Sequence, residues 1–132
     1  MHFLQQSVYT SSYLIVNEYL LFYTGLSLLT VHELDAIRCK EWRILPVFSS
    51  LNDRIGFMTF ALLHVPLFLW VFTELNQNPI DDSFRVGFDI FMLVHVGLHL
   101  LLLRHKHNEF KDVLSWLLII GAGLFGLLDL LS

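Results

Sequence analysis

Six of the seven histidines of this chain lie inside or directly beside apolar segments, where ionisable side chains are rare and by default indicate a functional site. Neutral imidazole is the commonest metal ligand in proteins, and a nearby Asp or Glu either joins the metal or orients a histidine. These residue types predict a site for a divalent metal, Zn, Fe or Mn, among which ligand types alone do not decide. The predicted ligands are His32, Asp35, His64, His95, His99 and His105.

Two carboxylates, Asp35 and Glu41, are the predicted catalytic groups of this pocket. Asp35 comes three residues after His32, so the two side chains share one face if the helix continues past the first apolar run. Glu33 lies nearly opposite Asp35 on a helix that turns by about 100° per residue. We therefore expect Glu33 to be the less important carboxylate.

The spacing argues against two familiar metal sites and leaves haem as an alternative. In HELDA, Ala36 stands where the metalloprotease pattern H-E-x-x-H has its second histidine. The sequence also lacks the paired His-His boxes expected of membrane di-iron desaturases and hydroxylases. His64 and His95 could instead be the two axial ligands of a b-type haem between antiparallel helices. Only Gly97 offers obvious space for a porphyrin there, so a bare metal site is preferred.

Composition places this chemistry in a membrane. Hydrophobic residues make up 55% of the 132-residue chain and charged residues 15%, with a mean hydropathy of +0.63, which is too apolar for an ordinary soluble domain. Four apolar runs approach the roughly 20 residues that a spanning helix needs. They cover residues 14–31, 55–75, 86–103 and 113–131. The sequence therefore predicts an all-α, integral membrane four-helix bundle, a single four-span transmembrane domain over residues 1–132.

Charge asymmetry predicts how this bundle is oriented. Seven of the eight Lys and Arg residues fall in two short loops, one between the first two spans and one between the last two. Positively charged loops stay on the cytoplasmic side, so both termini are predicted to be extracytoplasmic. At about 1.5 Å per residue, His64 and His95 then lie about 12–13 Å from the inner face. The pocket is thus predicted near the inner leaflet.

Small residues in the fourth span raise the question of partners. In SWLLIIGAGLFGL, Ala122 and Gly126 have the small-xxx-small spacing that lets helix backbones approach closely in lipid. Packing within the bundle is the favoured role, and a homo-oligomer through this Gly-rich span is the alternative. Membrane lipids are expected partners, because the basic loops suit anionic headgroups. Nucleic acid is not expected, since the charges are too few and scattered.

Several blocks of the chain carry a resemblance to a known family. VHELDAIRCKEWRIL, LLHVPLF, HVGLHLLLRHKHNEF and SWLLIIGAGLFGL resemble an uncharacterised family of small bacterial four-span integral membrane proteins, catalogued as a domain of unknown function. The resemblance covers nearly the full length and brings no activity with it. It implies a four-helix fold in the bacterial inner (cytoplasmic) membrane. Its sharpest element is H-E-x-D-A followed by E-W, here His32, Glu33, Asp35, Ala36, Glu41 and Trp42.

Three functions stay open at this point. The leading hypothesis is a metal-dependent membrane enzyme or metal-binding protein that acts on a lipid-like or other membrane-soluble substrate. The second is a non-catalytic structural or oligomeric membrane protein whose histidines join helices through hydrogen bonds. The third is a b-type haem protein or a carrier of cations or protons, since chains of His and carboxylates also serve as relays. An enzyme needs bound metal and a portal for its substrate, whereas a packing protein needs neither.

Overall fold

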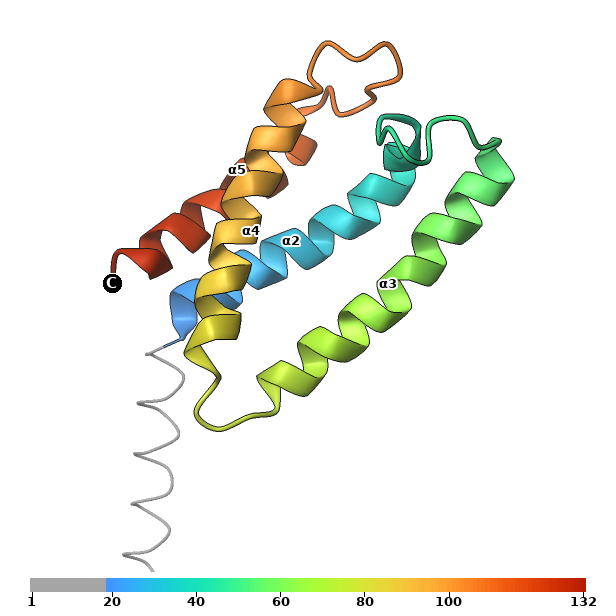
Figure 1. Cartoon of the computed structure of the whole chain (residues 1–132). Coiled ribbons are helices and arrows are strands. Elements are labelled where there is room, and N and C mark those ends of the chain that lie inside the picture. The colour runs from blue at the N-terminus through green and yellow to red at the C-terminus, as the bar shows by residue number, and fades with distance from the viewer. Residues whose placement is uncertain (1–18) are drawn as a thin grey trace, which may run out of the picture.

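Four long helices dominate residues 19–132, the part of the chain that the computed structural model describes (Figure 1). They are α2 (Leu20–Arg38), α3 (Asp53–Leu75), α4 (Asp82–Leu101) and α5 (Val113–Leu130), and a short 3₁₀ helix, η1 (Glu41–Arg43), lies between α2 and α3. Each long helix has the length and apolar composition needed to cross a membrane. The predicted all-α fold with four helices is confirmed, and each helix is a candidate membrane span, which suggests a multi-pass membrane protein.

The first of these helices extends beyond the predicted first span. Residues 14–18 of that span lie outside the described residues, whereas at the other end α2 continues to Arg38. The helical hydrogen-bond pattern persists there, because the Cys39 N–H still bonds the Asp35 carbonyl oxygen. It ends where Lys40 turns left-handed, with a φ of 52°. His32 and Asp35 therefore lie on one buried face of α2, as their spacing predicts.

Short polar side chains begin the other three helices. The side-chain oxygens of Asn52, Asp81 and Asp112 accept hydrogen bonds from backbone N–H groups three residues later, at 3.0, 2.9 and 2.8 Å. Such N-caps satisfy donors that the first helical turn leaves unpaired, and each typically stabilises a helix by about 1 kcal/mol. These caps start α3 and α4 a few residues earlier than the apolar runs alone predict.

The small residues of α5 face the neighbouring helices. α5 packs against both α2 and α4. A Cβ on Gly126 would lie 3.1 Å from the carbonyl oxygen of Asp89. One on Gly123 would lie 2.4 Å from a methyl carbon of Val96, and Ala122 is 1% exposed. Close backbone packing within the bundle therefore uses these residues, and a homo-oligomer through this span stays a prediction.

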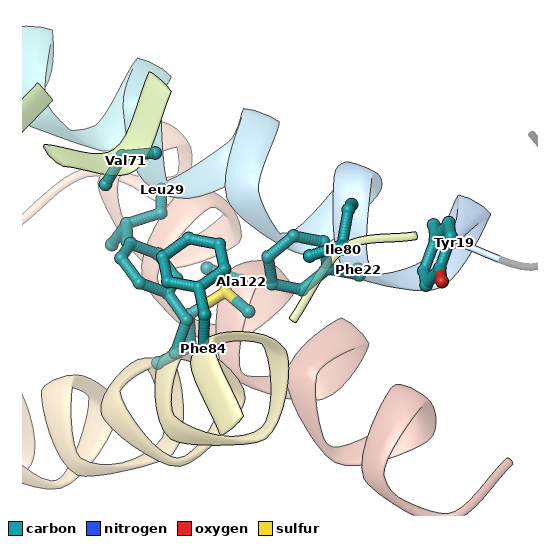
Figure 2. Close-up of a cluster of buried hydrophobic side chains, with 9 residues drawn as sticks. Tyr19, Phe22, Leu29, Val71, Ile80, Phe84 and Ala122 are labelled. Atoms are coloured by element: carbon teal, nitrogen blue, oxygen red, sulfur yellow. The ribbon is translucent and has the colours of Figure 1, made fainter. Parts of the chain in front are cut away.

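An apolar core joins these helices near the start of α2 and α4, as Figure 2 shows. Phe22 is completely buried, and its ring meets the Phe84 ring edge-on at a centroid distance of 5.9 Å. Edge-to-face pairs of this kind contribute about 0.5–1.5 kcal/mol beyond their buried area. The core consists of Tyr19, Phe22, Leu29, Val71, Ile80, Phe84, Phe88, Met92 and Ala122. A second apolar cluster, which includes Ala36, Trp42 and Phe110, lies toward the other end of the bundle.

Helix α3 lies alongside α2 (Figure 1), and many of its apolar side chains are exposed. Leu62, Leu69 and Phe72 are 66%, 67% and 65% exposed. Bilayer hydrocarbon is the solvent that such a surface fits. The contact between α3 and η1 is close, because the Trp42 ring lies directly on Gly56, where a Cβ would be only 2.4 Å from Trp42 Cδ1.

Candidate metal centre

Three histidines and one glutamate form a buried group at the end of the bundle that carries η1. His32 comes from α2, Glu41 from η1, and His95 and His99 from successive turns of α4. One ligating atom from each residue lies within 4.8 Å of all the others. All four residues are buried, and His32 is not exposed at all. Three separate elements, α2, η1 and α4, thus converge on one point where these atoms could hold a metal ion.

The distances between the donor atoms suit a single ion. Two ligands that each lie about 2.1 Å from a tetrahedral metal are about 3.4 Å apart. His99 Nε2 lies 3.6 Å from Glu41 Oε1, and His32 Nε2 lies 3.8 Å from Glu41 Oε2. His95 Nε2 and His99 Nε2 are 3.1 Å apart. These three separations bracket the value that one bound ion requires, and the widest separation in the group reaches at most 4.8 Å.

Unpartnered nitrogen atoms in the group also point to a ligand. Neither ring nitrogen of His32 has a hydrogen-bond partner among residues 19–132, and the same holds for His99 Nδ1, although all three atoms are buried. A buried polar atom without a partner costs about 1–3 kcal/mol. An ion at the centre of the group would satisfy His32 Nε2, which already faces Glu41. Imidazole donors suit transition metals rather than Ca or Mg.

Glu41 reaches the group because the chain reverses after α2. Lys40 takes the left-handed conformation that ends α2, and η1 begins at the next residue. Trp42, which is 3% exposed, packs on the backbone of α3 and holds η1 in place. Burial raises the pKa of the Glu41 carboxyl to about 8, an effect that the charge of Glu33 increases and His64 reduces. In the metal-free protein this burial favours the protonated carboxyl near pH 7, and a bound cation would replace its proton.

The loop between α4 and α5 covers part of the group. Phe110 is 1% exposed, and its ring centroid lies 4.6 Å from that of His99 and 5.4 Å from that of His32. Asn108 holds this loop, because its amide N–H groups donate to the carbonyl oxygens of Leu102 and Leu103, just after α4. Its carbonyl oxygen accepts the Phe110 N–H at 2.9 Å. An apolar cover of this kind limits solvent access to the donors.

A cavity of about 200 Å³ adjoins the metal group. Glu41, His95 and His99 line this cavity, together with Glu33 from α2 and His64 from α3. The rest of its wall is apolar and includes side chains of α3, α4 and the loop after η1. Three of the four metal donors therefore face a space that part of a small molecule can enter.

Glu33 and His64 form a polar pair that joins α2 to α3. His64 Nε2 lies 2.8 Å from Glu33 Oε2, and His64 Nδ1 lies 2.7 Å from the Phe60 carbonyl oxygen. A carbonyl oxygen only accepts hydrogen bonds, so Nδ1 of His64 carries a proton. The contact between His64 Nε2 and Glu33 Oε2 is a hydrogen bond only if a second proton lies on one of these two atoms. The sequence places His64 among the ligands and gives Glu33 little weight. The structure instead pairs the two residues beside the metal group.

Asp35 lies outside the metal group, although its spacing from His32 predicts it as a ligand and a catalytic group. Its Oδ1 accepts a hydrogen bond from Arg38 Nε at 2.7 Å, and its Oδ2 accepts one from the Ser115 hydroxyl at 2.5 Å. Arg38 also donates to Asp112. The Ser115 N–H and the Arg38 guanidinium hold the pKa of the Asp112 carboxyl below its usual value. The structure therefore uses Asp35 to join the end of α2 to the start of α5.

The sequence also predicts His105 as a ligand and His64 and His95 as haem ligands. His105 lies in the loop after α4, where its Nδ1 accepts a backbone N–H at 3.3 Å. The Nε2 atoms of His64 and His95 contact Glu33 and His99 rather than facing each other across an empty slot. A porphyrin would have to break both contacts and enlarge a cavity of about 200 Å³. The geometry favours a metal ion alone.

Sequence reasoning missed the residues that support the site from outside. Gly56 accommodates the Trp42 ring, and Asn108 positions Phe110 over the histidines. In the sequence, Gly56 is recognisable only as a glycine near the start of a predicted span. Asn108 is recognisable only as an amide residue in a short loop. Neither signal reveals a metal site, because each role depends on a contact with another segment.

Together these features describe a helical protein with four candidate membrane spans and a buried His/Glu group that could hold a metal ion. The sequence model of a protein family described as a family of unknown function, DUF6713, matches residues 18–132. The chain therefore belongs to this family, which confirms the resemblance to a family without assigned activity. No curated protein and no solved structure matches the chain.

Proposed function

We propose that this protein is a membrane metalloprotein in which His32, Glu41, His95 and His99 hold one divalent transition-metal ion. The proposal rests on four buried donor atoms that come from three separate elements and lie within 4.8 Å of one another. Zinc, iron and manganese are the candidates, because imidazole and carboxylate donors together suit all three. The histidines bind as neutral imidazoles and Glu41 binds as a carboxylate.

The hydrogen bonds of the histidines support metal binding over a purely structural role. Histidines that only join helices are expected to bond from one helix to another. The hydrogen bond between His95 and His99 lies within α4, and His32 has no hydrogen-bond partner among the described residues. His64 does bond across helices, to Glu33, and so fits the structural role better than the other three.

We also propose that the protein is a metal-dependent enzyme that acts on a lipid-like substrate. The cavity beside three of the donors supports this step, because a substrate oxygen placed there would lie next to the ion. The bound metal would supply Lewis-acid polarisation of that oxygen. Glu41 then acts as a ligand. Asp35 stays outside the reaction, since Arg38 and Ser115 occupy its oxygens.

Elemental analysis of the purified protein, run beside an optical spectrum, tests the metal centre. We expect about one Zn, Fe or Mn ion per chain and no haem Soret band. His99→Ala and Glu41→Gln should lose most of this metal, because each removes one of four donors. His107→Ala is the matched control, since His107 is an exposed loop residue outside the group. Equal metal content in His99→Ala and His107→Ala, or a protein that takes up no metal on reconstitution, would refute the proposal.

The orientation proposed for the protein places the metal centre near the inner leaflet of a bacterial cytoplasmic membrane. Seven of the eight basic residues lie in or beside the α2–α3 and α4–α5 loops, which flank the end of the bundle that holds the group. Positive loops stay on the cytoplasmic side. A reporter fused after Ser132 should therefore read as extracytoplasmic. A cytoplasmic signal would reverse the orientation and move the centre to the opposite leaflet.

A further inference from the structure

We infer that the molecule recognised by this centre is an amphiphile whose alkyl chain lies in an apolar groove between α2 and α3. Its polar end contacts the Glu33–His64 pair on the way to the metal. The inference rests on the proposed metal centre and adds the class of molecule that reaches it, the route it takes and the two residues that position it.

The groove is a space of about 300 Å³ between α2 and α3. Its walls include Leu34 and Ile37 of α2 and Ala61, Val65 and Phe68 of α3. Leu34 is 69% exposed and Val65 is 63% exposed, so the groove opens to the surroundings of the two helices. For helices that span a membrane these surroundings are hydrocarbon, and an alkyl chain is the occupant that hydrocarbon supplies.

The groove shares part of its wall with the cavity beside the metal group. Glu33, Phe60 and His64 line both spaces. The Glu33–His64 contact therefore lies where the apolar groove meets the metal donors. Taken together, the two volumes fall within the roughly 300–1,000 Å³ that ligand sites commonly occupy. One molecule can thus place an apolar part between the helices and a polar part beside Glu41 and His99.

The polar pair selects an amphiphile over a plain hydrocarbon. Glu33 and His64 are only partly buried, with side chains 16% and 19% exposed, although they face apolar surroundings. Polar groups at such a position are costly unless they find partners. The carboxylate of Glu33 can accept further hydrogen bonds from a hydroxyl or an amide of a bound headgroup. A hydrocarbon offers no such donor, and a small water-soluble molecule would leave the groove unused.

Binding of two hydroxamates to the Co²⁺-loaded protein in detergent tests this inference. Both probes carry the same metal-binding headgroup, but acetohydroxamate has no alkyl chain of useful length, whereas decanohydroxamate has a long one. The visible Co²⁺ spectrum reports binding without any assay of activity. Ala61→Trp fills the groove. Leu62→Trp is the matched control, because Leu62 is the next residue of α3 and is 66% exposed. All three proteins meet the same micelle-bound pool of probe.

We expect Ala61→Trp to weaken decanohydroxamate binding by at least about tenfold, because an alkyl chain cannot occupy space that a ring already fills. Acetohydroxamate binding and Co²⁺ content should stay unchanged, and Leu62→Trp should behave as the wild type. Unchanged decanohydroxamate binding in Ala61→Trp, or an equal loss for both probes, would overturn the groove. A wild-type protein that takes up no Co²⁺ would overturn the metal centre itself, so the two failures are distinct. Val65→Trp replaces Ala61→Trp if that variant does not fold.

Discussion

Replacing Asp35 by Asn should lower the stability of the protein and leave its metal in place. The carboxylate of Asp35 accepts hydrogen bonds from Arg38 and Ser115, and it contacts none of the four proposed ligands through a hydrogen bond. Asn has nearly the same volume and keeps one oxygen that can accept a bond. The change therefore removes the charge of this group while the shape of the junction between α2 and α5 stays the same.

The magnitude follows from the surroundings of the two partners. The Arg38 side chain is 54% exposed, so solvent screens its contribution to about 0–1 kcal/mol. Ser115 is completely buried, and its bond to a charged acceptor contributes about 1.5–3 kcal/mol. Because Asn keeps one accepting oxygen, it can retain only one of these two hydrogen bonds, and we expect Asp35→Asn to cost about 1–2 kcal/mol and Asp35→Ala about 2–4 kcal/mol. For a chain of this size, 1 kcal/mol corresponds to about 3–5 °C in melting temperature.

Thermal unfolding in a single detergent, together with metal analysis of the same samples, measures both quantities. The melting temperatures should be compared for metal-free proteins, because a bound ion stabilises the folded state by mass action. Glu41→Gln is the contrasting variant. It should lose the metal, while the junction between α2 and α5 stays intact. An Asp35→Asn protein that loses its metal but melts at the wild-type temperature would refute the role given to Asp35 and restore it as a ligand.

Three further changes test the packing and the metal. Gly126→Leu should destabilise the bundle by about 1–3 kcal/mol, because even an added Cβ at Gly126 would lie 3.1 Å from a backbone oxygen of α4. An unchanged melting temperature in detergent would contradict this prediction. Gly56→Leu should displace Trp42 and with it Glu41, so metal content should fall below that of Gly97→Leu, whose added side chain meets open space. Removing the metal with a chelator should lower the melting temperature. If the free metal concentration was 100 times the Kd, the loss of stability is about 2.7 kcal/mol. Identical melting temperatures with and without metal would speak against a bound ion.

Much of the fold follows from local properties of the sequence. The length and polarity of the apolar runs determine four spans, because each helix satisfies its own backbone hydrogen bonds in lipid whatever its neighbours are. The spacing of His95 and His99 places both on one face of their helix for the same local reason. Helix ends depend on capping as well as on hydropathy. Asp81 therefore starts α4 at Asp82, before its apolar run, and α2 continues to Arg38 after its own.

Which carboxylate joins the histidines is decided only by the tertiary structure. Asp35 shares a helical face with His32, but its oxygens meet Ser115, which lies 80 residues away in the sequence. Glu41 has no helical register with any histidine, yet the left-handed turn before it folds η1 back toward His32 and His99. Local periodicity determines the direction of a side chain relative to its own helix. The neighbour it meets depends on how the helices pack, and that information is spread over the whole chain.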